Sequence, residues 1–429
     1  MISLPTLPLA RKGYIASTSG CVATVASLES RVGDVCNFEL PDGRTRRGEV
    51  IALRGRTVLV WVEDGVAELS PATPVTLSPD SALLPVGPAL LGRVIDPYGR
   101  PIDGRPRPAC AQRLPIQRPC PTPMTRRRID QRFVTGVRAI DGLCTLGIGQ
   151  RVGVMAPAGV GKTTLLGMLA RYCESDVNVI ALVGERGREV REFIEDSLGE
   201  SGLARSVVVC ATSDRSPLER QRAAFAATTV AEYFRDRGQH VLLMVDSLTR
   251  FARAQRELGL AQGEMPTRRG YPSSLFATLP ALVERAGPGS DGPGGDITAL
   301  YTVLMEDAES ADPVAEEVKS LLDGHLLLSR SIATSGIFPA IDIRASISRL
   351  MDGLVDPRER DLARQARSVL EKHAEILPLI QMGEYRAGED ARADQAVRCI
   401  EPLRAWLGQS RTEKSELTDT EIGLAEVFS

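Results

Sequence analysis

The sequence predicts an α/β protein with three parts: a small N-terminal β-barrel over residues 1–80, a central domain over residues 81–348 and a helical C-terminal domain over residues 349–429. Three observations give this fold class. Short β-branched strands follow one another early in the chain, long apolar runs alternate with helical stretches in the middle, and only helical spacing remains at the end. The composition, 43% apolar and 25% charged residues, is ordinary for a soluble globular protein.

The N-terminal part is expected to be a small barrel because its apolar runs are short and separated by turn residues such as Asp64-Gly65. The predicted strands are Tyr14–Ile15, Cys21–Ala26, Val35–Leu40, Gly48–Leu53 and Thr57–Val62. A structural cap is the simpler interpretation of such a barrel. The rival is a nucleic-acid-binding barrel, which would need exposed aromatic side chains, and this segment offers only Tyr14, Phe38 and Trp61.

Residues 81–125 hold ten of the 28 prolines. Proline fixes φ and lacks an N–H donor, so this stretch is excluded as a regular helix or a central strand. We expect an ordered connector or a linker at the start of the central domain.

The central domain is expected to contain a parallel sheet covered by helices, because its strand-like runs are apolar throughout rather than alternating. These runs are Val152–Ala156, Val177–Val183, Val207–Ala211, Val241–Val245 and Ile297–Met305.

The C-terminal domain shows apolar residues at helical spacing and no strand pattern. The residues that recur are Leu362, Ala366, Val369, Leu370, His373 and Ile376. We expect Pro378 to interrupt this helix.

A phosphate-binding loop is predicted at Ala156–Thr163, between a strand and a helix. Alanine stands where the common pattern has its first glycine, which is tolerable if Ala156 keeps a negative φ. The contacting segment would be Ala158, Gly159, Val160, Gly161, Lys162, Thr163 and Thr164. Its two glycines let backbone N–H groups turn toward phosphate, Lys162 would reach the β- and γ-phosphates of ATP, and Thr163 would bind Mg²⁺.

Two carboxylates follow apolar runs of the predicted sheet. Asp246 ends the run that starts at Val241, so it is placed at the carboxyl edge, where it would hold Mg²⁺. Glu185 follows the run Val177–Val183 and is placed at the same edge. From spacing alone Glu185 is either the residue that orients an attacking water or part of a solvated turn.

Further motifs resemble the rotary ATPase family, which contains the F- and V-type catalytic subunits and the flagellar and type III secretion ATPases. The matching segments are Thr135-Gly-Val-Arg-Ala-Ile-Asp-Gly-Leu, Gly149-Gln-Arg, the phosphate-binding loop, Gly184-Glu-Arg-Gly-Arg-Glu, Asp246-Ser-Leu-Thr-Arg-Phe-Ala, Gly270-Tyr-Pro, Phe276-Ala-Thr-Leu-Pro, Gly336-Ile-Phe-Pro-Ala-Ile-Asp-Ile and Ser346-Ile-Ser-Arg349. The resemblance covers nearly the whole chain and implies a RecA-like P-loop core that hydrolyses ATP with Mg²⁺.

Within the family the sequence is most similar to the type III secretion (injectisome) ATPases. The run from Asp312 to His325, the glycine-rich segment Gly287–Gly295 and the segment Gln381–Tyr385 carry this similarity. A flagellar export ATPase is the alternative within the family.

The resemblance implies roles for single residues. Glu185 would align the attacking water, Arg186 would lie close to the phosphates, and Phe338 would stack on adenine. Arg349 matches the arginine finger that enters a neighbouring subunit's site, a task that suits the fork of a guanidinium. Without the resemblance, Phe338 would be interpreted as a core phenylalanine and Arg349 as a surface residue of a helix.

The same resemblance implies a homohexamer with the barrels as its crown, a central stalk protein, and a stator that holds the ring beneath an export gate at the inner membrane. Chaperone–effector complexes would be its cargo, released and unfolded for export. The absence of a secretory signal and of any apolar run near 18 residues predicts a cytoplasmic protein. The resemblance implies that it is peripherally associated with the inner membrane at the secretion apparatus.

Two other classes of protein remain to be compared. A Rho-like RNA translocase would also be a ring with an N-terminal barrel, but the net charge of −3 and 4% aromatic residues argue against nucleic acid as a partner. A non-catalytic ring subunit usually lacks the glutamate after Gly184, which is present here as Glu185. The three histidines lie far apart in the sequence, so a histidine-based metal site is not expected. The eight cysteines form no C-x-x-C pair and are expected to be reduced thiols.

Overall fold

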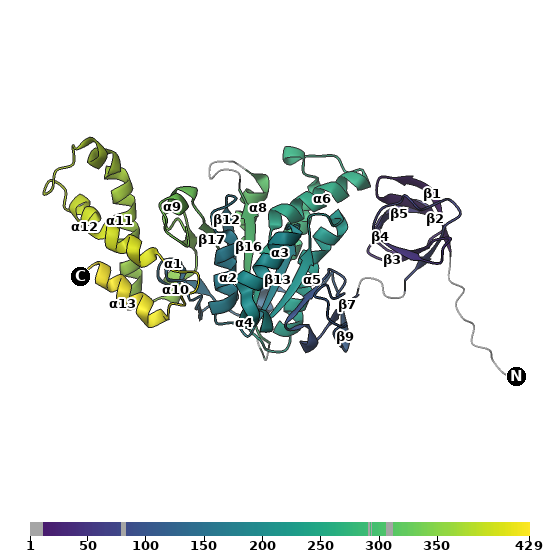
Figure 1. Ribbon diagram of the computed structural model, residues 1–429, viewed down its shortest axis with the longest axis horizontal. Helices are drawn as coiled ribbons and strands as arrows, with labels where there is room; N and C mark the ends of the chain where they lie inside the picture. The colour runs from purple at the N-terminus through teal and green to yellow at the C-terminus, as the bar shows by residue number, and fades with distance from the viewer. Residues whose placement is uncertain (1–11, 79–82, 291, 293, 306–311) are drawn as a thin grey trace.

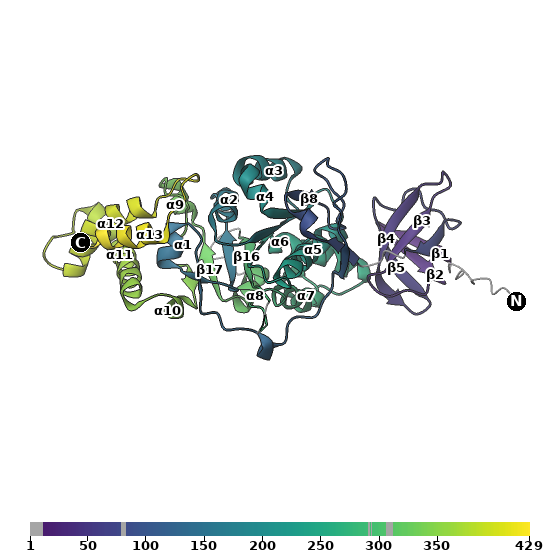
Figure 2. The same cartoon turned by 90° about the horizontal axis from the view of Figure 1, so that it is seen from below.

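The computed structural model describes residues 12–78, 83–290, 292, 294–305 and 312–429. The molecule is elongated, with a β-barrel at one end, a mixed α/β body in the middle and a helical part at the other end (Figure 1). A view turned by 90° shows the same succession along the long axis (Figure 2). This is the predicted fold class, although residues 1–11 of the expected barrel part lie outside the described residues.

The barrel is closed and its strands are ordered β1-β2-β5-β4-β3-β6. The strands are β1 Gly13–Ser19, β2 Val22–Ala26, β3 Val35–Glu39, β4 Thr45–Arg54, β5 Thr57–Val62 and β6 Pro74–Leu77. The five predicted strands are present. The sixth, β6, was not predicted because it is short and starts with a proline, which is tolerated at the first position of a strand. It pairs with both β3 and β1 and so closes the barrel.

The central sheet has the strand order β18-β17-β12-β16-β15-β13-β14-β8, and only β18 runs antiparallel to its neighbour. The strands are β8 Arg93–Ile95, β12 Arg151–Ala156, β13 Val177–Val183, β14 Ser206–Ala211, β15 Val241–Asp246, β16 Ile297–Leu304, β17 Gly324–Leu327 and β18 Ile347–Ser348. The three strands without a predicted counterpart, β8, β17 and β18, are short and lie toward the edges of the sheet. The proline-rich connector supplies edge strand β8 and a separate pair, β7 Leu83–Val86 with β9 Gln112–Pro115.

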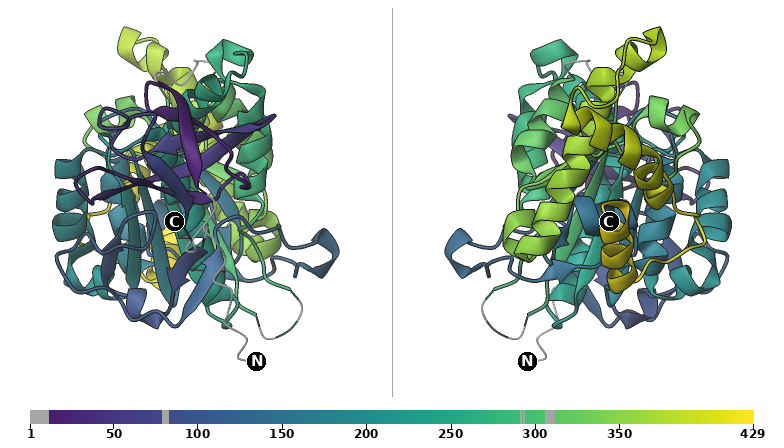
Figure 3. Two further views of the ribbon diagram at one scale, coloured as in Figure 1. Left: turned by 90° about the vertical axis from the view of Figure 1, so that its right-hand side faces the viewer. Right: turned by 90° about the vertical axis from the view of Figure 1, so that its left-hand side faces the viewer.

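Helices cover both faces of the sheet, as a view along the long axis shows (Figure 3). Strand β13 explains why: Val177, Val179, Ala181 and Val183 pack in one apolar cluster, whereas Ile180 and Leu182 pack in the other. The first cluster contains α5 Pro217–Arg235, α6 Leu248–Gln262, α7 Ser273–Val283 and α8 Pro313–Leu321. The second contains α1 Arg138–Leu143, α2 Lys162–Tyr172, the π-helical segment Phe193–Leu198, and residues of α3 Gly187–Glu192. The short helix α4 Gly199–Ala204 follows that segment, and β10 Arg132–Phe133 pairs with β11 Leu146–Gly147.

The C-terminal part is helical, as predicted. Its helices are α10 Met351–Leu354, α11 Pro357–Met382, α12 Ala391–Leu407 and α13 Leu417–Val427, and the short helix α9 Arg330–Thr334 precedes them at the end of the central domain. The prediction that Pro378 interrupts α11 is wrong, because the helix continues to Met382 and ends at Gly383 with φ 74°. Pro378 lies on an exposed face, so water can satisfy the carbonyl that lacks its donor.

Candidate active site

The predicted phosphate-binding loop lies between β12 and α2. Ala156 is the last residue of β12 and therefore has the extended backbone with negative φ that an alanine requires at this position. Gly159 and Gly161 have φ values of 81° and 90°, which favour glycine. No side chain caps α2, whose first residue is Lys162. The backbone N–H groups and the positive end of the helix dipole are therefore available to an anion.

Three parallel strands bring Lys162, Glu185 and Asp246 together at the carboxyl edge of the sheet. Lys162 follows β12, Glu185 follows β13, and Asp246 ends β15. The Lys162 ammonium contacts a carboxylate oxygen of Asp246 and lies 3.7 Å from Oε1 of Glu185. Asp246 is only 3% exposed and also accepts a hydrogen bond from the Thr302 hydroxyl (2.7 Å). The sheet therefore places one cation between two carboxylates.

The surroundings of Glu185 disfavour the charged form of its carboxyl group. Burial raises the pKa of Glu185 to about 7, and the negative charge of Asp246 adds to this increase, whereas Lys162 and Arg250 oppose it. Arg250 of α6 lies 3.2 Å from Glu185 Oε2 and also donates to the carbonyl of Gly184. A carboxyl group with a pKa near neutrality can exchange a proton at working pH, as acid–base chemistry requires.

Arg186 and Arg349 are not part of this cluster. The Arg186 side chain is 74% exposed and pairs with Glu189 (3.0 Å). Arg349 is exposed and follows β18, whose Ser348 pairs with Gly324 at the start of β17. Because β17 is parallel to β12, Arg349 lies at the amino edge of the parallel strands, opposite the phosphate-binding loop.

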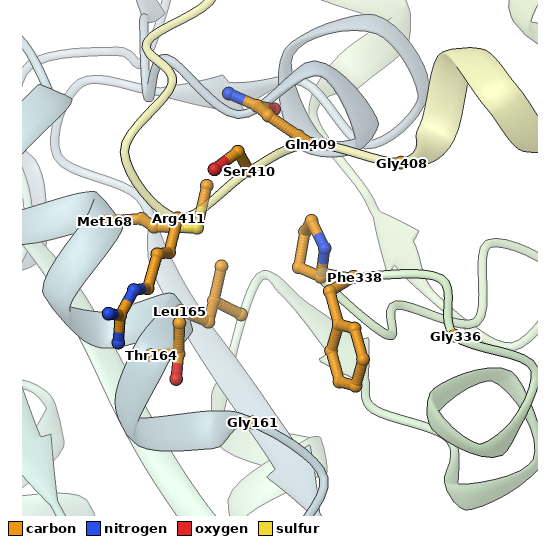
Figure 4. Close-up of a pocket in the computed structure, with 11 residues that line it drawn as sticks. Gly161, Thr164, Leu165, Met168, Gly336, Phe338, Gly408, Gln409, Ser410 and Arg411 are labelled. Atoms are coloured by element: carbon orange, nitrogen blue, oxygen red, sulfur yellow. The ribbon is translucent and has the colours of Figure 1, made fainter.

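Phe338 lines a pocket beside the loop, with a volume of about 490 Å³ (Figure 4). Its ring lies 3.6 Å from the point where a Cβ on Gly161 would be. The other residues that line the pocket come from α2 and the residue before it, from the segment around Phe338, and from the loop that joins α12 to α13. They are Gly161, Thr164, Leu165, Met168, Gly336, Pro339, Gly408, Gln409, Ser410 and Arg411. A mainly apolar pocket next to a phosphate-binding loop suits a nucleobase.

Sequence reasoning gave no role to Arg250, Thr302 or the residues after α12. Arg250 stands within the matched segment that begins at Asp246, so the motif contained that residue without showing its contact. Thr302 is a polar residue inside an apolar strand, a pattern that predicts a buried hydrogen bond. Nothing in the sequence places Gln409 at a pocket formed by α2.

A parallel sheet with a phosphate-binding loop, two acidic residues at its carboxyl edge and an adjoining apolar pocket defines a nucleotide-binding P-loop protein. Two family models match the chain. Residues 136–348 match the nucleotide-binding domain of the ATP synthase alpha/beta family, and residues 355–426 match the C-terminal domain of type III secretion ATPases of the EscN type.

Similar proteins extend the match to nearly the full length. The type 3 secretion system ATPase of Xanthomonas euvesicatoria is 52% identical over 97% of this chain and 94% of its own. The flagellum-specific ATP synthase of Salmonella typhimurium is 44% identical over 98% of this chain and 95% of its own. The solved assembly of the ATPase EscN with its central stalk EscO, from enteropathogenic E. coli, matches with a TM-score of 0.90 and 42% identity over 97% of this chain and 100% of that chain.

The chain therefore belongs to the ATP synthase alpha/beta family, in its branch of type III secretion system ATPases. This confirms the resemblance found in the sequence and the prediction of an ATP-hydrolysing enzyme. All eight cysteines are free in the structure. Within the described ranges, no helix has the length and apolarity needed to cross a membrane.

Proposed function

We propose that this chain hydrolyses ATP at interfaces between the subunits of a homohexamer and uses the cycle to release chaperones from effectors and to unfold them for export. One observation carries the proposal of a shared site: Arg349 lies at the opposite edge of the sheet from Glu185 and Asp246. An arginine finger in that position serves a neighbour's nucleotide, not its own. The active unit is then a pair of subunits, and a monomer hydrolyses ATP poorly.

The residues present fit a magnesium nucleotide. In the described part of the chain no three His, Cys, Asp or Glu residues form a metal cage. Mg²⁺ in phosphoryl-transfer enzymes needs only one or two protein ligands because phosphate oxygens and water supply the rest. The Thr163 hydroxyl and the Asp246 carboxylate would hold it. The bound ion would neutralise charge on the β- and γ-phosphates.

The other residues act on ATP directly. Residues 158–164 bind the phosphates through backbone N–H groups, and Lys162 leaves Asp246 to contact the γ-phosphate. Glu185 orients a water for in-line attack and Phe338 stacks on adenine. Arg186 lies close to the phosphates of the bound ATP. The neighbour's Arg349 stabilises the charge that spreads over the transferring phosphoryl group.

The partners of the ring follow from its relatives. EscN has been solved as an assembled ATPase in complex with its central stalk EscO, which supports a hexamer with a stalk protein at its centre here too. We extend this to a stator and an export gate at the inner membrane, with the ring on the cytoplasmic side. Residues 1–80 would form the crown, residues 81–348 the ATPase ring, and residues 349–429 the face that receives chaperone–effector complexes. No nucleic acid is needed.

Subunit mixing tests the shared site. Glu185→Gln and Arg349→Ala are each expected to abolish steady-state ATP hydrolysis, and a mixture of the two is expected to recover it. Recovery follows because an Arg349→Ala subunit supplies Glu185 while its Glu185→Gln neighbour supplies Arg349. Specific activity of the wild type should also rise with protein concentration.

The control is Arg364→Ala, which removes an exposed arginine of α11 that pairs with Asp361 (3.0 Å) on the same helix. This variant should keep full activity alone. If the mixture stays inactive although both variants form rings, Arg349 does not act in trans and the proposal is wrong. Stimulation of hydrolysis by added RNA would instead favour the translocase class.

A further inference from the structure

The C-terminal domain supplies one wall of the nucleotide pocket. Residues 408–411 join α12 to α13 and line the pocket, while Phe338 stands on its other side. Figure 4 shows Arg411 extending beside Thr164 of α2, with Phe338 across the pocket. A loop of the helical domain is therefore within reach of a nucleotide bound to its own subunit.

The backbone of this loop is fixed to the nucleotide-binding domain. Gln409 is 5% exposed, and its backbone N–H donates to the carbonyl of Phe338 (2.7 Å). Its side-chain amide donates to the carbonyls of Gly136 (2.8 Å) and Glu413 (2.9 Å). Its side-chain oxygen accepts from the backbone N–H of Arg138 (2.9 Å). All the polar atoms of the Gln409 side chain thus serve to hold the loop.

Arg411 is anchored to the helix that follows the phosphate-binding loop. Its carbonyl accepts hydrogen bonds from Arg171 (2.5 Å) and from the Tyr172 hydroxyl (3.2 Å), both at the end of α2. These contacts fix the position of the Arg411 backbone relative to α2, whose first turn holds Thr164. From this position the side chain runs beside α2, and its guanidinium lies next to Thr164 (Figure 4).

The guanidinium of Arg411 has no acidic partner among the residues that the structure describes. The nearest acid along the loop, Glu413, is paired with Arg138 (2.9 Å) instead. An exposed arginine that lines a pocket without a counter-ion, beside the first turn of a phosphate-binding helix, is complementary to a nucleotide phosphate. Thr164 stands in the first turn of α2, directly after the loop, and lines the same pocket as Phe338. A nucleotide held by the loop with its base in this pocket would therefore have its α-phosphate beside Thr164.

We propose that Arg411 is a nucleotide-binding residue that contacts the α-phosphate side of ATP and ADP from the C-terminal domain. This inference rests on the proposed placement of ATP between Phe338 and Lys162. Because the loop connects α12 to α13, the contact ties the helical domain to the nucleotide state of its own subunit. ATP binding and the position of the effector-receiving face are then coupled within one chain, in addition to any coupling through the ring.

The test compares Arg411→Ala and Arg411→Lys with the matched control Arg398→Ala, an exposed arginine of α12. Loss of a charged contact to phosphate is expected to raise the KM for ATP on the order of tenfold or more, with kcat changed much less. Arg411→Lys keeps the charge and should recover part of the affinity. Inorganic tripolyphosphate, which has no base, should inhibit the Arg411→Ala enzyme more weakly than the wild type.

Two results would overturn the inference. An unchanged KM in an active Arg411→Ala enzyme would make Arg411 a solvated surface residue. Weaker ATP binding with unaltered tripolyphosphate inhibition, and no rescue by lysine, would place Arg411 on the base instead. Failure of the proposed function has a different signature, since it would appear in the Glu185 and Arg349 mixing experiment whatever Arg411 does.

Discussion

Two of the buried carboxylates in the central domain differ in how they meet their cations: Glu185 in the candidate active site, and Glu232 beneath the proline-rich connector. Glu232 accepts two hydrogen bonds from Arg285, at 2.9 and 2.7 Å, and both side chains are at most 2% exposed. Arg285 also donates to the carbonyl of Ile116 (2.7 Å) and to Thr229 (2.9 Å). Glu185 has its cations at 3.7 and 3.2 Å and a pKa raised to about 7.

The difference separates a structural carboxylate from a catalytic one. The Arg285–Glu232 pair satisfies its hydrogen-bonding groups within the protein, and it fixes the connector to α5, so removing one partner leaves a buried charge. Glu185 is incompletely paired and desolvated, an arrangement that costs stability but leaves a carboxylate able to bind water.

The largest effect is expected on catalysis from Glu185→Gln. Glutamine keeps the size of the side chain but neither accepts a proton nor carries charge, so kcat should fall by about 10²–10⁴-fold. Nucleotide binding should persist because the phosphate-binding loop is unchanged. Steady-state hydrolysis combined with binding of a fluorescent ADP measures both.

A matched substitution on the structural side provides the control. Glu232→Gln should leave kcat of the folded enzyme near the wild-type value. If Glu185→Gln hydrolyses ATP as fast as Glu232→Gln does, Glu185 is not the residue that aligns water, and it is no more catalytic than Glu232.

The next effect is on folding stability, from Arg285→Met. Breaking a buried ion pair by removing one partner costs about 3–5 kcal/mol, here because Glu232 would lose the two hydrogen bonds from Arg285 and keep, among the described residues, the contact with Arg118 near the surface. Calorimetric unfolding measures the loss. The double variant Glu232→Gln with Arg285→Met should recover much of it, and a single variant as stable as the wild type would show that the pair does not hold the connector.

The two carboxylates also differ in how far the sequence could predict them. Glu185 and Asp246 each follow directly after an apolar run, so the rule for parallel sheets places them at one edge together with the loop at Ala156–Thr163. The fold class follows from the same runs. Glu232 lies in α5 and Arg285 in the turn after α7, and nothing local in either segment indicates that they form a pair.

Contacts between distant segments account for most of what was missed. Gln409 donates to the carbonyl of Gly136, 273 positions earlier in the chain, and hydrophobic spacing carries no information about such a pairing. Strands β6 and β18 are too short to show a period. The interruption expected at Pro378 was wrong because its exposure, which decides whether the helix tolerates proline, is a property of the packed molecule.

A third prediction concerns the pH dependence of stability. The folded pKa of Glu185 is about 7, above the value of 4.5 for a free glutamate, so folding favours the protonated form. Its contribution to stability is complete below pH 4.5 and is lost as pH rises through 7. Glu185→Gln should therefore unfold at a higher temperature than the wild type at pH 8, and the difference should shrink as the pH falls toward 5.

The measurement is calorimetric unfolding of nucleotide-free protein at both pH values. Glu232→Gln is again the matched control, since it should be less stable than the wild type at pH 8. If Glu185→Gln is destabilised at pH 8 instead, Glu185 is stabilised as a carboxylate and resembles Glu232 after all.

The smallest effect is expected from Arg250, which acts on ATP only through Glu185. It lies 3.2 Å from Glu185 and donates to the Gly184 carbonyl, so it fixes both the charge and the direction of that side chain. Arg250→Gln should lower kcat by about tenfold and raise the pKa of Glu185, because one of the two cations that oppose the increase is gone. The acid limb of kcat/KM should then move to higher pH, and Arg250→Lys should restore part of the shift. If kcat falls while the acid limb of the kcat/KM profile stays at the same pH, Arg250 only holds the Gly184 turn in place and does not affect the pKa of Glu185.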